Sequence, residues 1–383
     1  MDLTIQQGDL AFAVGRALGS VQQKSTQPLL SCVLLEADAK GLRVTGTDLD
    51  EGTSVLVPCT VRTPGKCCVS ARHFNDVVRK MPKGALTIAM SGSQLEVRYA
   101  DGKGWSRFPA QPADEFPRVP ELKGDMRVTL EGDVLARMID RSAYAASTEP
   151  ARPQLNGVFV HATDKFLAFV ATDGHRLART SRKGSFGELS KDGIIVPSRV
   201  LNSVAKFANE ATSPVEMRVA DARNHIGFAT QVGEYQVQVY GRLIEGSYPN
   251  YEQVIPKDNP REMGLARTDL IEAVDIVASH ADSNTMQIRF SLRDGKFTVS
   301  SATADYGAGE QSVEAEYKGE NMEIGYNAKY LLQILRSIPT ERVTFRLKTA
   351  LSAGVIEPVG ALAQTDEDML CLIMPLRLPD AAG

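Results

Sequence analysis

Hydrophobic residues recur along parts of the chain at a spacing of three and four positions. In two segments the apolar positions are Phe74, Val77, Val78 and Met81, then Val200, Leu201, Val204 and Ala208. This spacing places the side chains on one face of a helix. Ser70, Ser198 and Asn327 precede such segments, where a polar side chain can accept hydrogen bonds from the first turn. The pattern predicts amphipathic helices over residues 71–81, 199–207 and 328–336.

Between the helices, short segments alternate apolar and polar residues, the period of a half-buried strand. Clear examples are residues 87–90 and 94–99, and residues 215–219 and 225–228. Each pair is separated by a polar turn. The sequence therefore predicts antiparallel hairpins between the helices.

Landmarks of this pattern repeat along the chain. Leu10 and Leu135, Pro28 and Pro153, and Asp48 and Asp173 are each separated by 125 positions. A looser third copy runs through residues 269–274 and 297–305. Helices are expected over residues 9–18, 133–139 and 269–274 as well, two in each copy. The fold class is therefore α+β, with three similar domains in tandem, each of two helices plus antiparallel sheets.

Proline-rich stretches at residues 116–120 and 248–256 separate the copies. Proline fixes its own φ and biases the preceding residue away from helix, so these stretches indicate extended connectors. The domains predicted from them are residues 1–122, 123–257 and 258–383.

Composition excludes several protein classes. The chain of 383 residues is 43% hydrophobic and 23% charged, and its 43 Lys+Arg and 47 Asp+Glu give a net charge of −4. These values are typical of a globular protein and argue against a strongly basic nucleic-acid binder. No apolar run approaches the roughly 18 residues of a membrane span, and no secretory leader is expected. Five cysteines without C-x-x-C spacing favour reduced thiols and a cytoplasmic location.

Basic residues stand opposite the apolar stripes of the predicted helices. They include Arg72, Arg79, Arg137, Arg199, Lys206, Lys329 and Arg336. A solvated surface is one interpretation. If these faces converged on one surface, they would instead hold a polyanion weakly through its phosphates, without reading bases.

Familiar catalytic motifs are missing from the sequence. It contains no G-x-x-x-x-G-K-[ST], G-x-G-x-x-G, G-x-S-x-G or H-E-x-x-H pattern, so no cofactor and no metal site is expected. A metal-dependent hydrolase built on Asp173 and His175 is a weak alternative, because no other ligand has suitable spacing. The apolar, proline-broken ending at residues 372–378 could form a groove for short peptides near the Gly174 loop, whereas residues 370–373 could instead form a strand that seals the core.

Two short motifs in the sequence resemble those of a known protein family. Residues 172–178, Thr-Asp-Gly-His-Arg-Leu-Ala, and residues 374–378, Met-Pro-Leu-Arg-Leu, together with the threefold repeat, resemble the bacterial β sliding clamps, the processivity subunits of DNA polymerase III. The resemblance runs over essentially the whole chain. It implies a non-enzymatic head-to-tail homodimer, closed into a six-domain ring around duplex DNA, with helices inside and sheets outside.

The resemblance also implies three sets of site residues. The peptide-binding pocket would comprise Arg152, Leu155, Thr172, Gly174, His175, Arg176, Leu177, Pro249, Val254, Leu372, Ile373, Met374, Pro375, Leu376, Arg377 and Leu378. DNA would contact Lys24, Arg72, Arg79, Arg137, Arg199 and Lys206. The dimer interface would join Arg98, Trp105, Arg107 and Phe108 to Ile276, Val277, Glu310, Glu314 and Glu316 of a second copy.

The implied partners are duplex DNA, bound without sequence specificity, and proteins that insert short peptides with a Leu-Phe-like end. These are the DNA polymerase III catalytic subunit, the clamp loader, other polymerases and repair proteins, with no membrane partner. Gln253 stands where relatives often carry a basic residue, and residues 379–383 extend past the usual end. A monomeric peptide-binding adaptor without ring closure is the alternative function.

Overall fold

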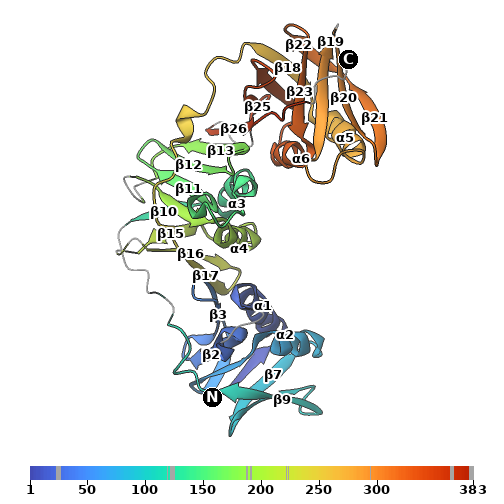
Figure 1. The fold of residues 1–383 in the computed structure, drawn as a ribbon. Coiled ribbons are helices and arrows are strands. Elements are labelled where there is room, and N and C mark those ends of the chain that lie inside the picture. The colour runs from blue at the N-terminus through green and yellow to red at the C-terminus, as the bar shows by residue number, and fades with distance from the viewer. Residues whose placement is uncertain are drawn as a thin grey trace. The chain divides into compact units, whose positions relative to one another are not determined.

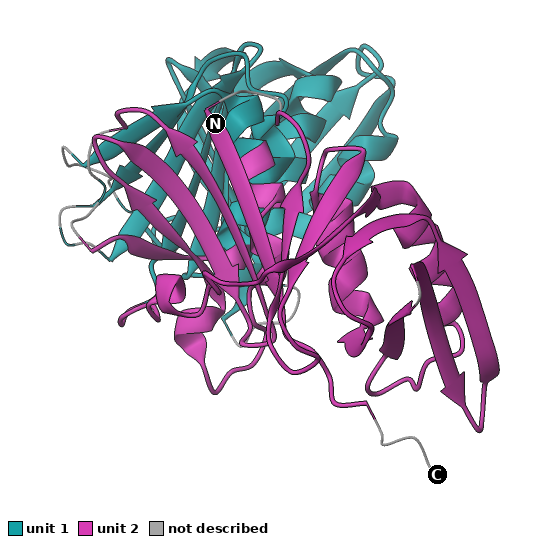
Figure 2. Ribbon diagram, turned by 90° about the horizontal axis from the view of Figure 1, so that it is seen from above, with its two compact units in different colours: residues 1–136, 187–191, 199–244 teal, residues 137–186, 192–198, 245–383 magenta. Residues whose placement is uncertain are grey.

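The computed structural model describes residues 1–383 apart from 23–26, 119, 121–125, 187–188, 190–191, 221, 223, 294, 363–365 and 379–383. The described chain forms three consecutive α+β repeats with two α-helices each (Figure 1). It divides into two compact units, coloured in Figure 2: residues 1–136, 187–191 and 199–244, and residues 137–186, 192–198 and 245–383.

The first repeat alternates a helix with a run of strands, twice over. Its elements are β1 (Asp2–Gln6), α1 (Gln7–Ala17), β2 (Cys32–Asp38), β3 (Gly41–Thr47), β4 (Glu51–Val57), β5 (Thr60–Thr63), β6 (Gly65–Ser70), α2 (Ala71–Lys80), β7 (Ala85–Ser91), β8 (Gln94–Tyr99) and β9 (Gly104–Gln111). Short 3-10 turns η1 (Leu18–Ser20) and η2 (Pro28–Ser31) lie between α1 and β2.

The second repeat follows the same order. It comprises β10 (Arg127–Leu130), α3 (Gly132–Asp140), η3 (Ala143–Ala145), η4 (Pro153–Leu155), β11 (Gly157–Ala162), β12 (Phe166–Thr172), β13 (Arg176–Lys183), β14 (Ile194–Pro197), α4 (Ser198–Ala208), β15 (Val215–Val219), β16 (His225–Val232) and β17 (Tyr235–Arg242).

The third repeat completes the chain. It comprises η5 (Tyr251–Gln253), β18 (Arg261–Ala266), α5 (Arg267–Ala278), β19 (Gln287–Arg293), β20 (Lys296–Thr303), β21 (Gly307–Val313), β22 (Ala315–Lys318), β23 (Met322–Asn327), α6 (Ala328–Ser337), β24 (Arg342–Leu347), β25 (Gly354–Pro358) and β26 (Glu367–Ile373). The three tandem α+β domains predicted from the sequence are thus present.

Antiparallel sheets continue from one repeat into the next. In the first unit β17 pairs with β4, so a 13-stranded sheet contains strands of the first and second repeats. In the second unit β26 pairs with β13, which joins the second and third repeats in a nine-stranded sheet. A four-stranded sheet, in the order β21-β20-β19-β23, completes the third repeat.

The predicted apolar stripes form the core of each repeat. Leu10 and Val14 of α1 and Phe74 and Val78 of α2 are fully buried, and α1 lies beside α2 on one face of the first-repeat strands (Figure 1). Of the three predicted caps, Asn327 Oδ1 accepts the N–H of Tyr330 at 3.0 Å and the Ser70 side chain makes no capping bond. Ser198 is the first residue of α4 itself.

Cys67 and Cys68 are buried in β6 as small apolar residues, and the five cysteines are free thiols. In the part of the chain that the structure describes, no helix is long and apolar enough to span a membrane.

Candidate functional sites

The Thr-Asp-Gly-His-Arg motif forms a tight turn between β12 and β13. Thr172 Oγ1 donates to the Arg176 carbonyl at 2.6 Å, and Asp173 Oδ1 accepts the N–H groups of His175 and Arg176 at 2.9 and 3.0 Å. Gly174 adopts φ +90°, which favours glycine. A Cβ at position 174 would stand 3.2 Å from Nη1 of Arg152. The turn therefore exposes His175 and keeps Arg152 close to its backbone.

Arg176 fixes this turn against two neighbouring elements. Its Nε bonds Asp173 at 3.0 Å, and its Nη2 donates to the carbonyl of Tyr144 at 2.7 Å. Its Nη1 donates to Gln333 of α6, and the guanidinium lies 4.5 Å from the Tyr330 ring centre. The side chain is almost completely buried. Arg176 is thus a positioning group rather than an exposed ligand.

The C-terminal motif lies directly beside the turn. The Met374 N–H donates to the His175 carbonyl at 2.8 Å, extending the pairing of β26 with β13. Beyond Pro375, Leu376 bridges to Gly325, and Gln287 Nε2 donates to the Arg377 carbonyl at 2.8 Å. Residues 370–373 are the core strand that the sequence left as one alternative, while residues 374–378 run along the surface of the third repeat.

An apolar cluster supports the turn and the tail. Leu177 and Leu372 are buried with Val170, Val355 and Leu370. Phe159, Tyr248, Tyr251 and Ile255 pack against this cluster, and the Phe159 and Tyr248 rings stack with centres 5.1 Å apart. Burial raises the pKa of the Tyr248 hydroxyl well above its usual value.

The predicted pocket residues all lie in the second unit, and we call the area that they cover, after the prediction, the peptide surface. Leu155, Leu177, Leu372 and Ile373 are buried beneath it, whereas Val254 and Met374 are exposed by 59% and 44%. Arg152, Gly174, His175, Pro249 and Arg377 are also exposed, and Thr172, Pro375, Leu376 and Leu378 are half-buried. The extension at residues 379–383 lies outside the described residues.

Sequence reasoning missed residues of α6 and η3 at this surface. The His175 and Tyr330 rings stack with centres 6.2 Å apart, and Gln333 and Tyr144 both bond Arg176. Tyr330 follows the cap Asn327 by three positions, which marks the first turn of a helix but says nothing about contact with residue 175.

The hydrolase alternative finds no support in this turn. Asp173 accepts backbone N–H groups and the Arg176 guanidinium, while the His175 ring stacks on Tyr330. Among the described residues, no group of three or more His, Cys, Asp or Glu is arranged to hold a metal.

The predicted DNA-contacting residues fall into two groups. Arg72 and Arg79 of α2 and Lys206 of α4 are exposed. Arg137 instead pairs with the buried Glu367 at 2.9 Å, and Arg199 pairs with Asp48 at 2.6 Å and Glu51 at 3.1 Å. The cations of Arg137 and Arg199 are therefore partly neutralised within the chain. Lys24 lies outside the described residues.

Glu367 is held by two arginines. Arg141 and Arg137 bond its oxygens at 2.6 and 2.9 Å. Burial raises the pKa of this carboxyl, but the hydrogen bonds and charges of the two guanidinium groups outweigh burial, so its pKa is lowered.

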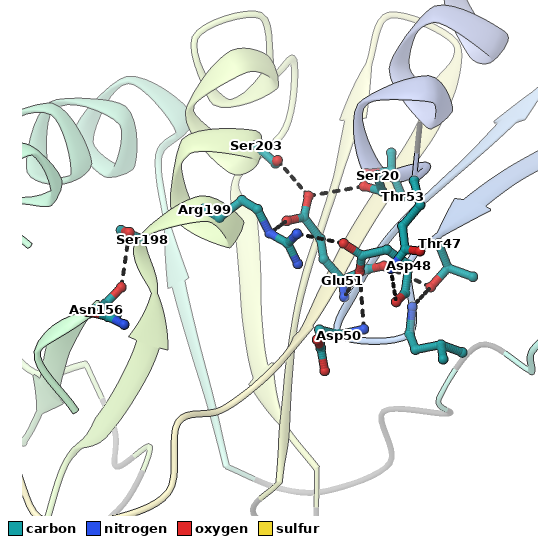
Figure 3. Close-up of polar contacts among 12 residues, drawn as sticks. Ser20, Thr47, Asp48, Asp50, Glu51, Thr53, Asn156, Ser198, Arg199 and Ser203 are labelled. Atoms are coloured by element: carbon teal, nitrogen blue, oxygen red, sulfur yellow. Dashed lines mark hydrogen bonds and ion pairs between the residues drawn. The ribbon is translucent and has the colours of Figure 1, made fainter. Parts of the chain in front are cut away.

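A second buried carboxylate, Glu51, lies where β4 meets α4 (Figure 3). Its Oε1 accepts from Ser203 at 2.7 Å and from Ser20 at 3.1 Å. Burial raises the pKa of Glu51 despite those hydrogen bonds and the charge of Arg199.

The predicted dimer residues lie on β8 and β9 of the first repeat and on α5, β21, β22 and the residue between these two strands in the third repeat. β9 pairs with β8 along residues 104–109, while β6 pairs with it only at Ala110 and Gln111. β21 forms one end of the four-stranded sheet. Trp105 and Ile276 are exposed by 57% and 52%, whereas Phe108 and Val277 are buried in their own repeats.

Charges near these edges are partly paired. Arg98 and Arg107 both bond Glu96, at 2.6 and 2.7 Å, and Glu316 bonds Arg342 at 2.9 Å. Glu310 and Glu314 are exposed.

Family comparisons cover the chain in three consecutive segments. Residues 1–120, 129–250 and 252–377 match the N-terminal, central and C-terminal domain models of the DNA polymerase III beta subunit. The boundaries drawn at 122/123 and 257/258 stay predictions.

Individual relatives are similar to this chain over their whole length. The chain is 30% identical to the beta sliding clamp of Caulobacter vibrioides over 384 residues, and 31% identical to that of Pseudomonas aeruginosa over 382 residues, covering 99% of this chain and 100% of each relative. A solved sliding clamp from Bartonella birtlesii, bound to griselimycin, matches with a TM-score of 0.91 and 27% identity over 99% of this chain and 100% of that one. The P. aeruginosa clamp structure matches with a TM-score of 0.89 and 30% identity over the same shares.

Proposed function

This chain belongs to the DNA polymerase III beta subunit family of sliding clamps, and from that premise we propose which of its residues bind peptides, contact DNA and close a ring. The chain is a polymerase processivity factor and not an enzyme. The proposal concerns the peptide surface, the contact with DNA and the closure of a ring.

The peptide surface binds short segments of polymerases and other replication proteins. The observation that carries this proposal is the 2.8 Å bond from the Met374 N–H to the His175 carbonyl, which places the exposed end of the tail beside the exposed turn. Leu177 and Leu372 supply an apolar base, and Met374 adapts its shape to different side chains. Burying a Leu or Phe anchor there stabilises a complex by about 1.5–3 kcal/mol.

Duplex DNA contacts the basic faces of the helices without sequence-specific contacts to its bases. Arg72, Arg79 and Lys206 offer exposed cations for phosphates, and such contacts are weak and salt-dependent. Arg137 and Arg199 contribute less because Glu367, Asp48 and Glu51 already compensate them. Retention therefore comes from topology more than from affinity.

A head-to-tail homodimer closes the ring. The free edge of β9 with the exposed Trp105 meets β21 and the exposed Ile276 of a second copy, and the acidic Glu310 and Glu314 face the Arg98 and Arg107 side. Such a heterologous contact, repeated with closure, covers the two strand edges that meet.

The partners follow from this role. They are the DNA polymerase III catalytic subunit, the clamp loader, and other polymerases and repair proteins that carry clamp-binding peptides. Replication of the chromosome places the chain in the cytoplasm.

Peptide binding is tested by fluorescence anisotropy with a labelled peptide that contains Gln and ends in Leu-Phe. His175→Ala combined with removal of residues 376–383 should abolish binding. Tyr330→Ala should weaken it about tenfold, because His175 and Arg176 lose the ring on which they stack. Lys329→Ala, the preceding residue of α6, is the matched control. Unchanged affinity in the double variant would contradict the peptide surface assigned here.

A further inference from the structure

A cavity of about 540 Å³ lies in the first unit, away from the peptide surface. Helices α1 and α2 of the first repeat and helix α4 of the second line it, with the apolar strand β17. Its size suits a small organic ligand. No residue of the predicted peptide pocket or dimer interface lines it.

An unsatisfied acceptor belongs to a residue in the wall of this cavity. Asn75 of α2 is only 5% exposed. Its Oδ1 has no hydrogen-bond partner within the described parts of the chain. The oxygen points toward Gly15 of α1, 3.7 Å from where a Cβ on that residue would stand. A buried amide oxygen without a donor is costly, so a ligand that brings an N–H group into the cavity would recover that cost.

Two cations without ion-pair partners stand on the same lining. Arg79 of α2 and Lys206 of α4 are exposed and form no ion pair with the residues that the structure describes. Arg16, the third basic residue here, is already bound to Glu210 and to the Lys206 carbonyl. The free charges therefore favour an anionic group at the mouth of the cavity.

The remaining lining is apolar and partly aromatic. Phe12 of α1 and Phe207 of α4 contribute rings, and Val237 and Val239 come from β17. Two carboxylates contact lining residues, and both are paired: Glu51 accepts from Ser203 and bonds Arg199, and Glu210 bonds Arg16. The lining thus combines two cations, an apolar wall with two rings and a hydrogen-bond acceptor.

We propose that this cavity binds a nucleotide whose base carries an exocyclic amino group. The phosphate lies at Arg79 and Lys206, the base lies against the aromatic lining, and its amino group donates to Asn75 Oδ1. The choice of a nucleotide over another organic anion rests on the proposed contact with DNA. The nucleotide comes either from an unpaired position of a bound strand or from free solution.

Calorimetric titration of the full chain with deoxyadenosine 5′-monophosphate tests the inference. Binding should fall about tenfold with purine deoxyriboside 5′-monophosphate, which lacks the amino group, and about tenfold with deoxyadenosine, which lacks the phosphate. Equal binding of all three ligands, or no binding of any, would overturn the proposal.

Protein variants locate the site independently. Gly15→Leu fills the cavity from a helical position where a Cβ has room, so nucleotide binding should be lost while the folded chain is retained. Arg79→Gln should weaken binding about tenfold, and Lys80→Gln on the same helix should leave it unchanged. Undiminished binding by Gly15→Leu would place the nucleotide elsewhere and overturn the assignment.

A single-stranded deoxyadenylate decamer distinguishes the two sources. Binding at least tenfold tighter than the monophosphate, lost in Gly15→Leu, identifies a strand nucleotide, whereas equal binding identifies a free one. Retention on circular DNA is measured separately in the same variants. In the wild-type chain, normal retention without nucleotide binding would overturn this inference alone, and lost retention with intact nucleotide binding would count against the ring. In Gly15→Leu, normal retention without nucleotide binding is the expected result.

Discussion

Glu51 and Arg176 stand at the same position of two equivalent turns and carry opposite charges. Each N–H donates to the aspartate three residues earlier, at 2.8 Å for Glu51 and 3.0 Å for Arg176, and each carbonyl accepts a threonine hydroxyl. Each side chain then bonds the sixth residue of a following helix, Ser203 of α4 or Gln333 of α6. The two junctions between repeats thus share one backbone design with inverted electrostatics, and only the Arg176 junction carries the peptide surface.

The raised pKa of Glu51 predicts an unusual dependence of stability on pH. The folded chain holds this proton more tightly than the unfolded chain, so the stabilisation is complete below the ordinary pKa of about 4.3 and is lost as pH rises through the raised value. Between pH 4 and pH 7 the free energy of unfolding of the wild type should therefore fall relative to Glu51→Gln. Denaturant titrations at several pH values measure this difference. Glu131→Gln, at an exposed position of the same unit, is the matched control for the loss of a carboxylate.

Glu367 should behave in the opposite way. Its pKa is lowered in the folded chain, so its stabilisation is present above the ordinary value and is lost as pH falls through the lowered one. Glu367→Gln should cost about 3 kcal/mol at pH 7, because Arg141 is left buried without a counter-charge. The cost should shrink on acidification. A cost that is constant across this range would contradict the ion-pair account.

Position 174 favours glycine for two reasons, its left-handed backbone conformation and the closeness of the Arg152 side chain. Gly174→Ala forces a Cβ into a left-handed conformation near Arg152 and should destabilise the chain by about 1–2 kcal/mol while weakening peptide binding. Gly233→Ala is the matched control, since Gly233 has φ +60° with nothing within 4 Å of its Cβ. It should lose similar stability and keep full peptide affinity. Equal loss of peptide affinity in both variants would mean that the turn has no specific role.

The dependence of DNA binding on salt separates free arginines from paired ones. Arg72→Gln should lower the slope of log K against log salt by about 0.9, the value for one phosphate contact. Arg137→Gln should change the slope much less, because Glu367 already binds that guanidinium. Anisotropy on a labelled duplex over a series of salt concentrations measures both slopes. A larger effect from Arg137 would show that its ion pair opens on DNA.

Local periodicity predicted the helices well because their apolar stripes are long and regular. The prediction of residues 71–81 against the observed Ala71–Lys80, and of residues 328–336 against Ala328–Ser337, differs by one residue at the C-terminal end. The continuation of one sheet through β17 and β4 was not predictable, because strand pairing between repeats leaves no mark in either strand's own pattern.

For the site, the sequence identified motifs but not the partners of charged side chains. Arg199 and Arg72 both follow the start of a helix with similar apolar spacing, yet Arg199 binds Asp48 and Glu51 from the preceding repeat while Arg72 is exposed. Tyr330 contacts His175 over a distance of more than 150 positions in the chain. Such pairings depend on how repeats dock, which no local pattern specifies.

The claim that the chain holds DNA by encircling it is tested most directly on circular DNA that can be linearised. The protein is loaded onto a nicked circular duplex by the clamp loader, separated from free protein by gel filtration at high salt, and the circle is then cut once. The account predicts a species of twice the 41.5 kDa chain mass that stays on the circle and leaves after linearisation. Equal retention on circular and linear DNA, or retention as a monomer, would contradict it.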